Sequence, residues 1–228
     1  MVTVACVFWG DKFSVDYVYN LKSMVERNTT VPHQFVCFTD RKSMKDIKTV
    51  QLLPGYDGWW NKLQLFNTDN RLGTRMVYLD LDTLITGNID WLLKYDGLFM
   101  GIEDLGSTNE HQKFLKGRMQ SAVMSWDYNF HNSVWKKFKS STSNVKKFRG
   151  DGEYLNEVIS PSSRDFVQKR YPGQLKSYKY HVYPNTPSDK TSIICFHGRP
   201  SIVQAINETV KTGFGIYKPQ QWVKDNWK

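Results

Sequence analysis

The sequence predicts an α/β fold in which a Rossmann-like, mostly parallel central sheet is flanked by helices. The first observation is a set of short, almost entirely apolar segments. TVACVFW at 3–9 and RMVYL at 75–79 are typical of strands buried on both faces. The second observation is that such segments alternate with stretches whose apolar residues recur at helical spacing. Strands that alternate with helices favour a parallel sheet covered by helices on both faces.

The first half of the chain contains a regular series of elements. After the strand at 3–9, the apolar residues between 15 and 25 predict a helix, with Ser14 as its N-cap. Further elements are predicted as strands at 34–39, 48–53 and 75–79, and as a helix at 59–66 that follows a Pro-Gly turn.

The second half is less regular. It predicts strands at 97–103, 120–126 and 191–196 and helices at 130–139, 152–159 and 202–210. No linker composition divides the chain. We therefore predict one domain over residues 1–228 with a small C-terminal lobe.

The composition is that of a folded globular protein. Hydrophobic residues make up 40% and aromatic residues 14% of the 228 residues, which is enough for a full core. No apolar run approaches the roughly 20 residues of a membrane-spanning helix, and no secretory signal pattern precedes the first strand. Cys6, Cys37 and Cys195 each lie in an apolar, strand-like segment, which predicts buried, reduced thiols in a cytoplasmic protein.

The charge balance favours an anionic partner. The net charge is +9, and nucleic acid, an acidic membrane surface and a phosphorylated substrate all fit a basic protein. The lysines are spread along the chain without a basic block, so we expect no nucleic-acid partner. The Trp- and Lys-containing segment 221–228 suggests contact with the inner membrane surface as a further expectation.

Two aspartates follow the predicted strand at 75–79 directly. In open α/β sheets, ligands bind beyond the carboxyl ends of strands. Asp80 and Asp82 can hold one divalent cation there, and the cation can bridge the two phosphates of a nucleotide diphosphate. The same D-x-D pattern also occurs in turns and helix caps, so by itself it leaves both interpretations open.

A second candidate segment follows the last predicted strand. His197 can add a nitrogen ligand, which suits manganese better than magnesium. Gly198 allows close approach of backbone to a phosphate, and Arg199 offers a forked donor. The alternative is a structural histidine in a turn before Pro200. Lys62, near the start of the helix at 59–66, can reach a diphosphate or be an ordinary surface lysine.

The order of several segments resembles the GT-A glycosyltransferases close to glycosyltransferase family 8, the group that includes glycogenin and bacterial galactosyltransferases. The resemblance covers nearly the whole chain. It rests on FWG at 8–10, GWWNKLQLF at 58–66, RMVYLDLDTLITGNID at 75–90, SAVMSWD at 121–127, GDGEYLNE at 150–157, YPGQLKSYK at 171–179 and CFHGRP at 195–200.

The resemblance implies a metal-dependent, retaining glycosyltransferase. It would move a sugar from a nucleotide-diphosphate sugar, a UDP-hexose by default, to an unknown acceptor such as a glycan, lipid, protein or small molecule. Asp80, Asp82 and His197 would hold Mn²⁺ or Mg²⁺, and Asp151 would be catalytic. The donor would be contacted by Val7, Phe8, Trp9, Gly10, Lys62, Asp80, Leu81, Asp104, Gln120, Gly198 and Arg199.

Two departures from the family pattern concern residues that would lie near the reacting carbon of the donor sugar. Asp151 is followed by Gly152, where the family has glutamine, and Glu153 or water would have to replace the missing amide. Ser201 and Ile202 stand where the family tends to have a further basic residue.

Two other functions remain open beside the transferase. A sugar-nucleotide pyrophosphorylase would share the α/β class and the metal, but GDKFS at 10–14 is a poor Gly-rich phosphate loop. A non-catalytic nucleotide-sugar-binding module would keep the fold and lose the metal ligands, which are all present here.

Overall fold

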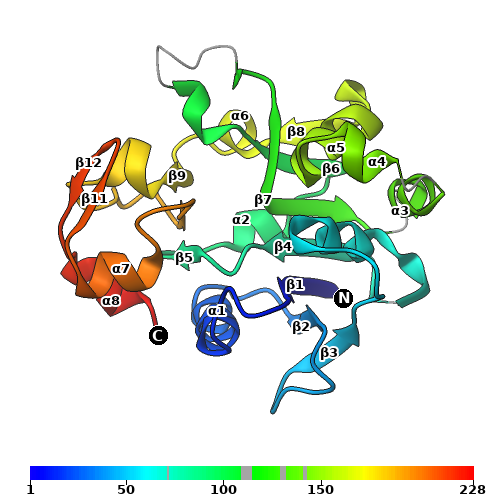
Figure 1. Cartoon of the computed structure of the whole chain (residues 1–228), viewed down its shortest axis with the longest axis horizontal. Coiled ribbons are helices and arrows are strands. Elements are labelled where there is room, and N and C mark those ends of the chain that lie inside the picture. The colour runs from blue at the N-terminus through cyan, green and yellow to red at the C-terminus, as the bar shows by residue number, and fades with distance from the viewer. Residues whose placement is uncertain (71, 109–114, 129–131, 141–142) are drawn as a thin grey trace.

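A seven-stranded sheet forms the centre of the computed structural model, which describes residues 1–70, 72–108, 115–128, 132–140 and 143–228 (Figure 1). The strand order is β3-β2-β1-β4-β7-β6-β8. β7 is antiparallel to both of its neighbours, whereas every other pair in this sheet is parallel. The prediction of a mostly parallel sheet is confirmed. The strands are β1 (Val2–Phe8), β2 (His33–Thr39), β3 (Lys48–Gln51), β4 (Arg75–Leu79), β6 (Phe99–Glu103), β7 (Met119–Asp127) and β8 (Arg164–Phe166).

Side chains of β1 alternate between two hydrophobic core clusters, one on each face of the sheet. Val4, Cys6 and Phe8 belong to the cluster that contains α1 (Asp16–Arg27), and Ala5 belongs to the cluster that contains the 3₁₀ helix η1 (Gly58–Phe66). This alternation follows from the period of two in a strand. The three cysteines are free and buried, as predicted.

Helix α1 begins one residue later than the predicted cap requires. Val15 is already in the helical region (φ −58°, ψ −26°) and makes no side-chain capping bond. The amide of Tyr17 donates to the carbonyl of Ser14 at 3.2 Å, and the Ser14 hydroxyl donates to Asp16 at 3.3 Å instead. The prediction of Ser14 as N-cap is therefore wrong, because the Ser14 carbonyl accepts from an amide of the first turn, whereas its hydroxyl accepts from no backbone amide there.

The helices on the η1 side cover the second core cluster. The segment predicted as a helix at 59–66 is a 3₁₀ helix, and the helix predicted at 130–139 begins in residues outside the described ranges. The helices around this face are α3 (Asn132–Lys139), α4 (Asn144–Lys147) and α5 (Asp151–Val158), which Figure 1 shows together at one end of the molecule.

The C-terminal elements gather at the opposite end in Figure 1. β5 (Thr83–Ile85), β10 (Ile193–Cys195) and β9 (Leu175–Ser177) form a three-stranded sheet, and β11 (Val210–Thr212) pairs with β12 (Gly215–Tyr217). The cluster that contains α1 also includes Tyr217 and Val223, so this lobe shares its core with the central sheet. The remaining helices are η2 (Thr68–Asn70), α2 (Asp90–Leu93), η3 (Leu105–Thr108), η5 (Pro161–Ser163), α6 (Val167–Arg170), the π-helix η6 (Tyr178–Val182), α7 (Ile202–Asn207) and α8 (Gln221–Asn226).

The tryptophans of the C-terminal segment are packed within the fold. The ring of Trp222 lies 6.1 Å from that of Tyr178, and the ring of Trp227 lies 4.9 Å from that of Tyr17. Arg27 donates hydrogen bonds to the backbone carbonyls of the last residues. These rings are used in packing, and contact with a membrane surface stays a prediction. Among the described helices none has the length and apolar character that crossing a bilayer requires.

The aromatic centre of the second cluster predicts a large stability effect. Phe66 is fully buried, and its ring stacks on Trp126 with centroids 4.5 Å apart. We expect Phe66→Ala to lower the free energy of unfolding by about 3–5 kcal/mol, because contacts are lost and a cavity is left. Urea denaturation measures this. Phe214→Ala is the control, since 63% of Phe214 is exposed. Similar losses in both variants would contradict the assigned core.

Candidate functional site

Asp80 and Asp82 lie in a turn between the end of β4 and the start of β5. The amide of Asp80 donates to the carbonyl of Ala122 on β7 at 2.8 Å, which extends the ladder one residue beyond β4. The amide of Thr83 donates to the carbonyl of Asp80 at 3.1 Å and closes the turn. Both aspartates are thereby held at the carboxyl end of a central strand, where ligands of open α/β sheets bind.

The Lys62 ammonium lies among the acidic side chains of this region. Its Nζ is 2.7 Å from Asp80 Oδ1 and 3.8 Å from Asp151 Oδ2. It also donates to Ser121 Oγ at 3.2 Å. On the other side, the Tyr78 hydroxyl donates to Asp80 Oδ1 at 2.5 Å. Lys62 on η1 therefore joins side chains from the turn after β4, from β7 and from the start of α5.

Asp151 is a buried carboxylate at the start of α5. Only 7% of the residue is exposed, and the Ser121 hydroxyl donates to Asp151 Oδ2. Ser121 thus contacts both the acid and the lysine. This arrangement orients Asp151 toward Lys62 by a hydrogen bond from the neighbouring strand rather than by a charge alone.

The electrostatics leave an excess of negative charge. Burial raises the pKa of Asp82, and the nearby Asp80 carboxylate raises it further, to about 7. Burial also raises the pKa of Asp151. Burial lowers the pKa of Lys62, but the Asp151 and Asp80 carboxylates outweigh it, so the pKa lies above its ordinary value. An added cation would relieve the repulsion between the carboxylates.

A cavity of about 370 Å³ opens onto these charges. Seven residues predicted for donor, metal or catalytic roles lie in or at it together. The lining consists of Val7, Trp9, Lys12, Phe13, Gly58, Trp59, Lys62, Tyr78, Asp80, Leu81, Asp82 and Asp151. Elements far apart in the sequence therefore supply one site at the carboxyl ends of β1 and β4.

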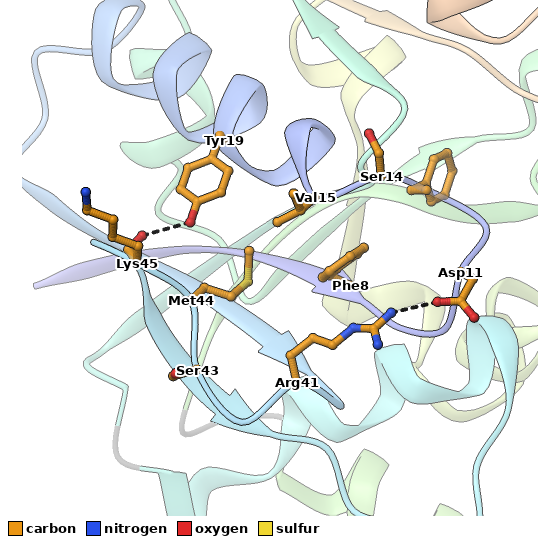
Figure 2. A pocket seen from close by; sticks show the side chains of 10 residues that line it. Phe8, Asp11, Ser14, Val15, Tyr19, Arg41, Ser43, Met44 and Lys45 are labelled. Carbon is orange, nitrogen blue, oxygen red and sulfur yellow. Dashed lines mark hydrogen bonds and ion pairs between the residues drawn. The ribbon is translucent and has the colours of Figure 1, made fainter.

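Phe8 lies in a different cavity, of about 640 Å³, on the α1 side of β1. Figure 2 shows Phe8, Val15 and Met44 around this space, with Arg41 at its rim. The Nη2 of Arg41 donates to Asp11 at 2.8 Å and to the carbonyl of Gly10 at 3.0 Å. We place the candidate site in the smaller cavity, because buried charges of both signs converge there.

The residue before His197 is hydrogen-bonded to the backbone of Asp82, but the His197 ring contacts Ser177. The amide of Phe196 donates to the carbonyl of Asp82 at 3.0 Å. The Nε2 of His197 lies 2.7 Å from Ser177 Oγ. Burial and then the Lys179 charge lower the pKa of His197 to about 4, which keeps the imidazole neutral. Within the described ranges, no three His, Cys, Asp or Glu side chains are grouped to hold a metal ion.

The other predicted donor contacts lie outside the lining of this cavity. The Asp104 carboxylate accepts a hydrogen bond from the amide of Gly106 at 2.9 Å. Gln120 precedes Ser121 in β7, and adjacent strand side chains point to opposite faces. Gly10, Gly198 and Arg199 are also absent from the lining. The roles of all these residues toward a ligand stay predictions.

Five residues of the site were not predicted from the sequence as binding residues. They are Lys12, Phe13, Gly58, Tyr78 and Ser121. The strand period held a usable signal for Tyr78, because a residue two positions before Asp80 faces the same side. Ser121 carried no such signal, since its partners are distant in the sequence.

Gly152 allows α5 to pack directly against the backbone of β7. A Cβ added at Gly152 would lie 2.8 Å from the carbonyl oxygen of Met119, closer than real Cβ atoms approach. The close packing keeps Asp151 next to Ser121. The glycine at position 152 thus has a steric reason in this chain.

Comparison with solved structures identifies the fold as GT-A. The galactosyltransferase LgtC, in a crystal structure with donor and acceptor sugar analogs, matches over 88% of each chain with a TM-score of 0.65 and 13% identity. The glycosyltransferase GlyE of Streptococcus pneumoniae TIGR4 matches 87% of this chain and 56% of its own, with a TM-score of 0.63 and 12% identity. The bifunctional glycosyltransferase WbbM matches 88% of this chain and 46% of its own, with a TM-score of 0.61 and 12% identity.

These similarities are structural only. No protein-family profile matches the chain, and no curated protein matches its sequence. At such low identity the likeness establishes the fold, and any chemistry depends on the residues in the cavity.

The contact at Gly152 predicts a specific loss of stability. We expect Gly152→Ala to lower the free energy of unfolding by about 1–3 kcal/mol, because the new methyl group forces α5 away from β7. Gly152→Gln should lose at least as much. Urea denaturation measures both, with Gly213→Ala as the control because a Cβ there meets nothing within 4 Å. A Gly152→Ala protein as stable as the control would contradict the close packing.

Proposed function

We propose that this chain is a metal-dependent, retaining glycosyltransferase related to family 8, which uses a nucleotide-diphosphate sugar, a UDP-hexose by default. The observation that supports this most directly is the cavity itself. Three carboxylates and a buried lysine converge in it at the carboxyl ends of β1 and β4, on a GT-A fold. A nucleotide diphosphate and its sugar need such a combination of cation-holding acids and an anion-binding base.

The aspartates in the cavity fit a divalent metal. Asp80, Asp82 and Asp151 face only two lysine ammonium groups in the lining, those of Lys12 and Lys62. Oxygen ligands with an excess of negative charge suit Mg²⁺ or Mn²⁺. Asp80 and Asp82 would hold the metal, and His197 would become the third ligand in the proposal once its Nε2 leaves the Ser177 hydroxyl. When bound, the ion would neutralise charge on the diphosphate.

Lys62 would stabilise the departing nucleotide diphosphate. Bond cleavage leaves negative charge on the phosphate oxygens, and a preorganised ammonium lowers the energy of that state. Its two carboxylate neighbours hold the lysine in its charged form, since they raise its pKa. Lys62 can shift its hydrogen bonds from Asp80 to a phosphate without a change of protonation.

Asp151 would face the sugar carbon as it gains positive charge. The carbon becomes oxocarbenium-like when the bond to the diphosphate breaks. Asp151 can stabilise this charge as a carboxylate, and the hydrogen bond from Ser121 fixes its orientation. Val7 and Trp9 would contact the base and ribose at the end of β1.

The proposal predicts metal-dependent turnover of a nucleotide sugar. Hydrolysis of a panel of UDP-, GDP-, ADP- and CMP-sugars with Mn²⁺ or Mg²⁺ measures it, and Mn²⁺ should be at least as effective. Asp82→Ala should abolish turnover without unfolding the protein, because the loss of one carboxylate relieves repulsion. Full activity in excess chelator would refute the metal role. Binding of a nucleotide sugar without any turnover would indicate the non-catalytic module instead.

Asp151 predicts a loss of rate without a loss of donor affinity. Asp151→Asn should reduce turnover by about 10²-fold or more, the scale of removing one preorganised electrostatic group. The dissociation constant of the donor should stay near the wild-type value, because the diphosphate contacts are elsewhere. The melting temperature serves as the control. Normal turnover with a lowered melting temperature would make Asp151 a structural residue at the start of α5.

A further inference from the structure

Two consecutive tryptophans in η1 have different surroundings. Trp60 is 7% exposed and stacks on Phe138 with ring centroids 5.5 Å apart, as a core residue does. Trp59 is 54% exposed. Single exposed apolar residues are common on protein surfaces, so exposure alone indicates nothing. The position of Trp59 is what distinguishes it.

The 3₁₀ geometry of η1 puts Trp59 on the same side as Lys62. In a 3₁₀ helix the side chains at i and i+3 eclipse each other, because one turn takes three residues. Trp59 and Lys62 are three residues apart in η1, and both line the cavity. The indole therefore stands over the residue that reaches Asp80 and Asp151.

The other neighbour of the indole is the residue before Asp151. A Cβ built on Gly150 would lie 3.5 Å from Trp59 Nε1 and 3.8 Å from two ring carbons, so the indole packs against this glycine. Two exposed tryptophans line the cavity, Trp59 at 54% and Trp9 at 37%, and Trp59 packs against the residue that precedes Asp151. Trp9, by contrast, lies at the end of β1.

The positions of donor and acceptor in the transfer reaction indicate which of the two substrates the Trp59 ring contacts. The proposed function, on which this inference rests, puts the diphosphate near Lys62 and Asp80 and the reacting carbon near Asp151. The acceptor hydroxyl has to approach that same carbon. An exposed ring beside Asp151 is then a surface for the acceptor rather than for the base.

The chemistry of the surface indicates the acceptor class. A pyranose presents a face of C–H groups to an aromatic ring while its hydroxyls point outward to polar partners, and an indole offers the largest such platform. The buried Asp151 carboxylate, next in the chain to the glycine that Trp59 packs against, disfavours an acidic group on the acceptor. We propose that Trp59 is a specificity-determining residue on which a neutral pyranose of the acceptor stacks, and that the acceptor is a carbohydrate.

The experiment compares the wild-type protein with Trp59→Ala and Trp59→Phe. The donor is the nucleotide sugar that the wild-type protein hydrolyses, and the probes are methyl β-glucoside, methyl β-galactoside, methyl α-mannoside and methyl N-acetyl-β-glucosaminide. We expect Trp59→Ala to lower the ratio of transfer to hydrolysis about tenfold through a higher KM for the probe, the scale of losing one aromatic contact. Trp59→Phe should recover most of the ratio. Phe214→Ala, the matched exposed-ring control, should leave it unchanged.

Two binding measurements separate the alternatives. Calorimetry of UDP binding should give similar dissociation constants for wild-type and Trp59→Ala proteins, and a tenfold loss of UDP affinity would assign the ring to the base and overturn the proposal. Saturation-transfer NMR detects the probe sugars without turnover. If no nucleotide sugar is turned over, the proposed function fails. Loss of the probe-sugar signal in Trp59→Ala would still support the inference in that case. Absence of any probe sugar signal or transfer in the wild-type protein would overturn it.

Discussion

The buried ammonium of Lys62 is the interaction on which the geometry of the site depends. It joins Asp80 after β4, Ser121 on β7 and Asp151 at the start of α5. Removing one partner of a buried charge pair costs about 3–5 kcal/mol. Each of these groups therefore holds the others in position, and the carboxylates stay in place before any ligand arrives.

A steric constraint complements this charge network. Gly152 lets α5 approach the backbone of β7, and this brings Asp151 within reach of the Ser121 hydroxyl. The GT-A fold then explains the location, because the carboxyl ends of β1 and β4 open onto one cavity. The fold is shared with proteins of about one-eighth sequence identity, so the proposed chemistry depends on these side chains and not on the likeness.

The regular elements could be predicted because their signals are local. The buried strands β1, β2 and β4 appear as short apolar segments, and Asp80 and Asp82 follow one of them directly. The cap of α1 was predicted wrongly and the 3₁₀ form of η1 was not predicted. A shift of one residue at a helix end, or a change from α to 3₁₀ hydrogen bonding, leaves the apolar spacing almost unchanged. Phe8 was grouped with Val7 and Trp9, although the strand period puts it on the opposite face.

The sequence by itself determined the α/β class, the buried cysteines and the place of the carboxylate pair, because each depends on a few adjacent residues. Only the tertiary structure decided which side chains meet. Lys62 and Ser121 are 59 residues apart and touch because η1 and β7 pack together. Likewise, nothing local distinguishes Trp59 from Trp60: one is exposed at the cavity and the other is buried against Phe138 because α3 covers only one side of η1.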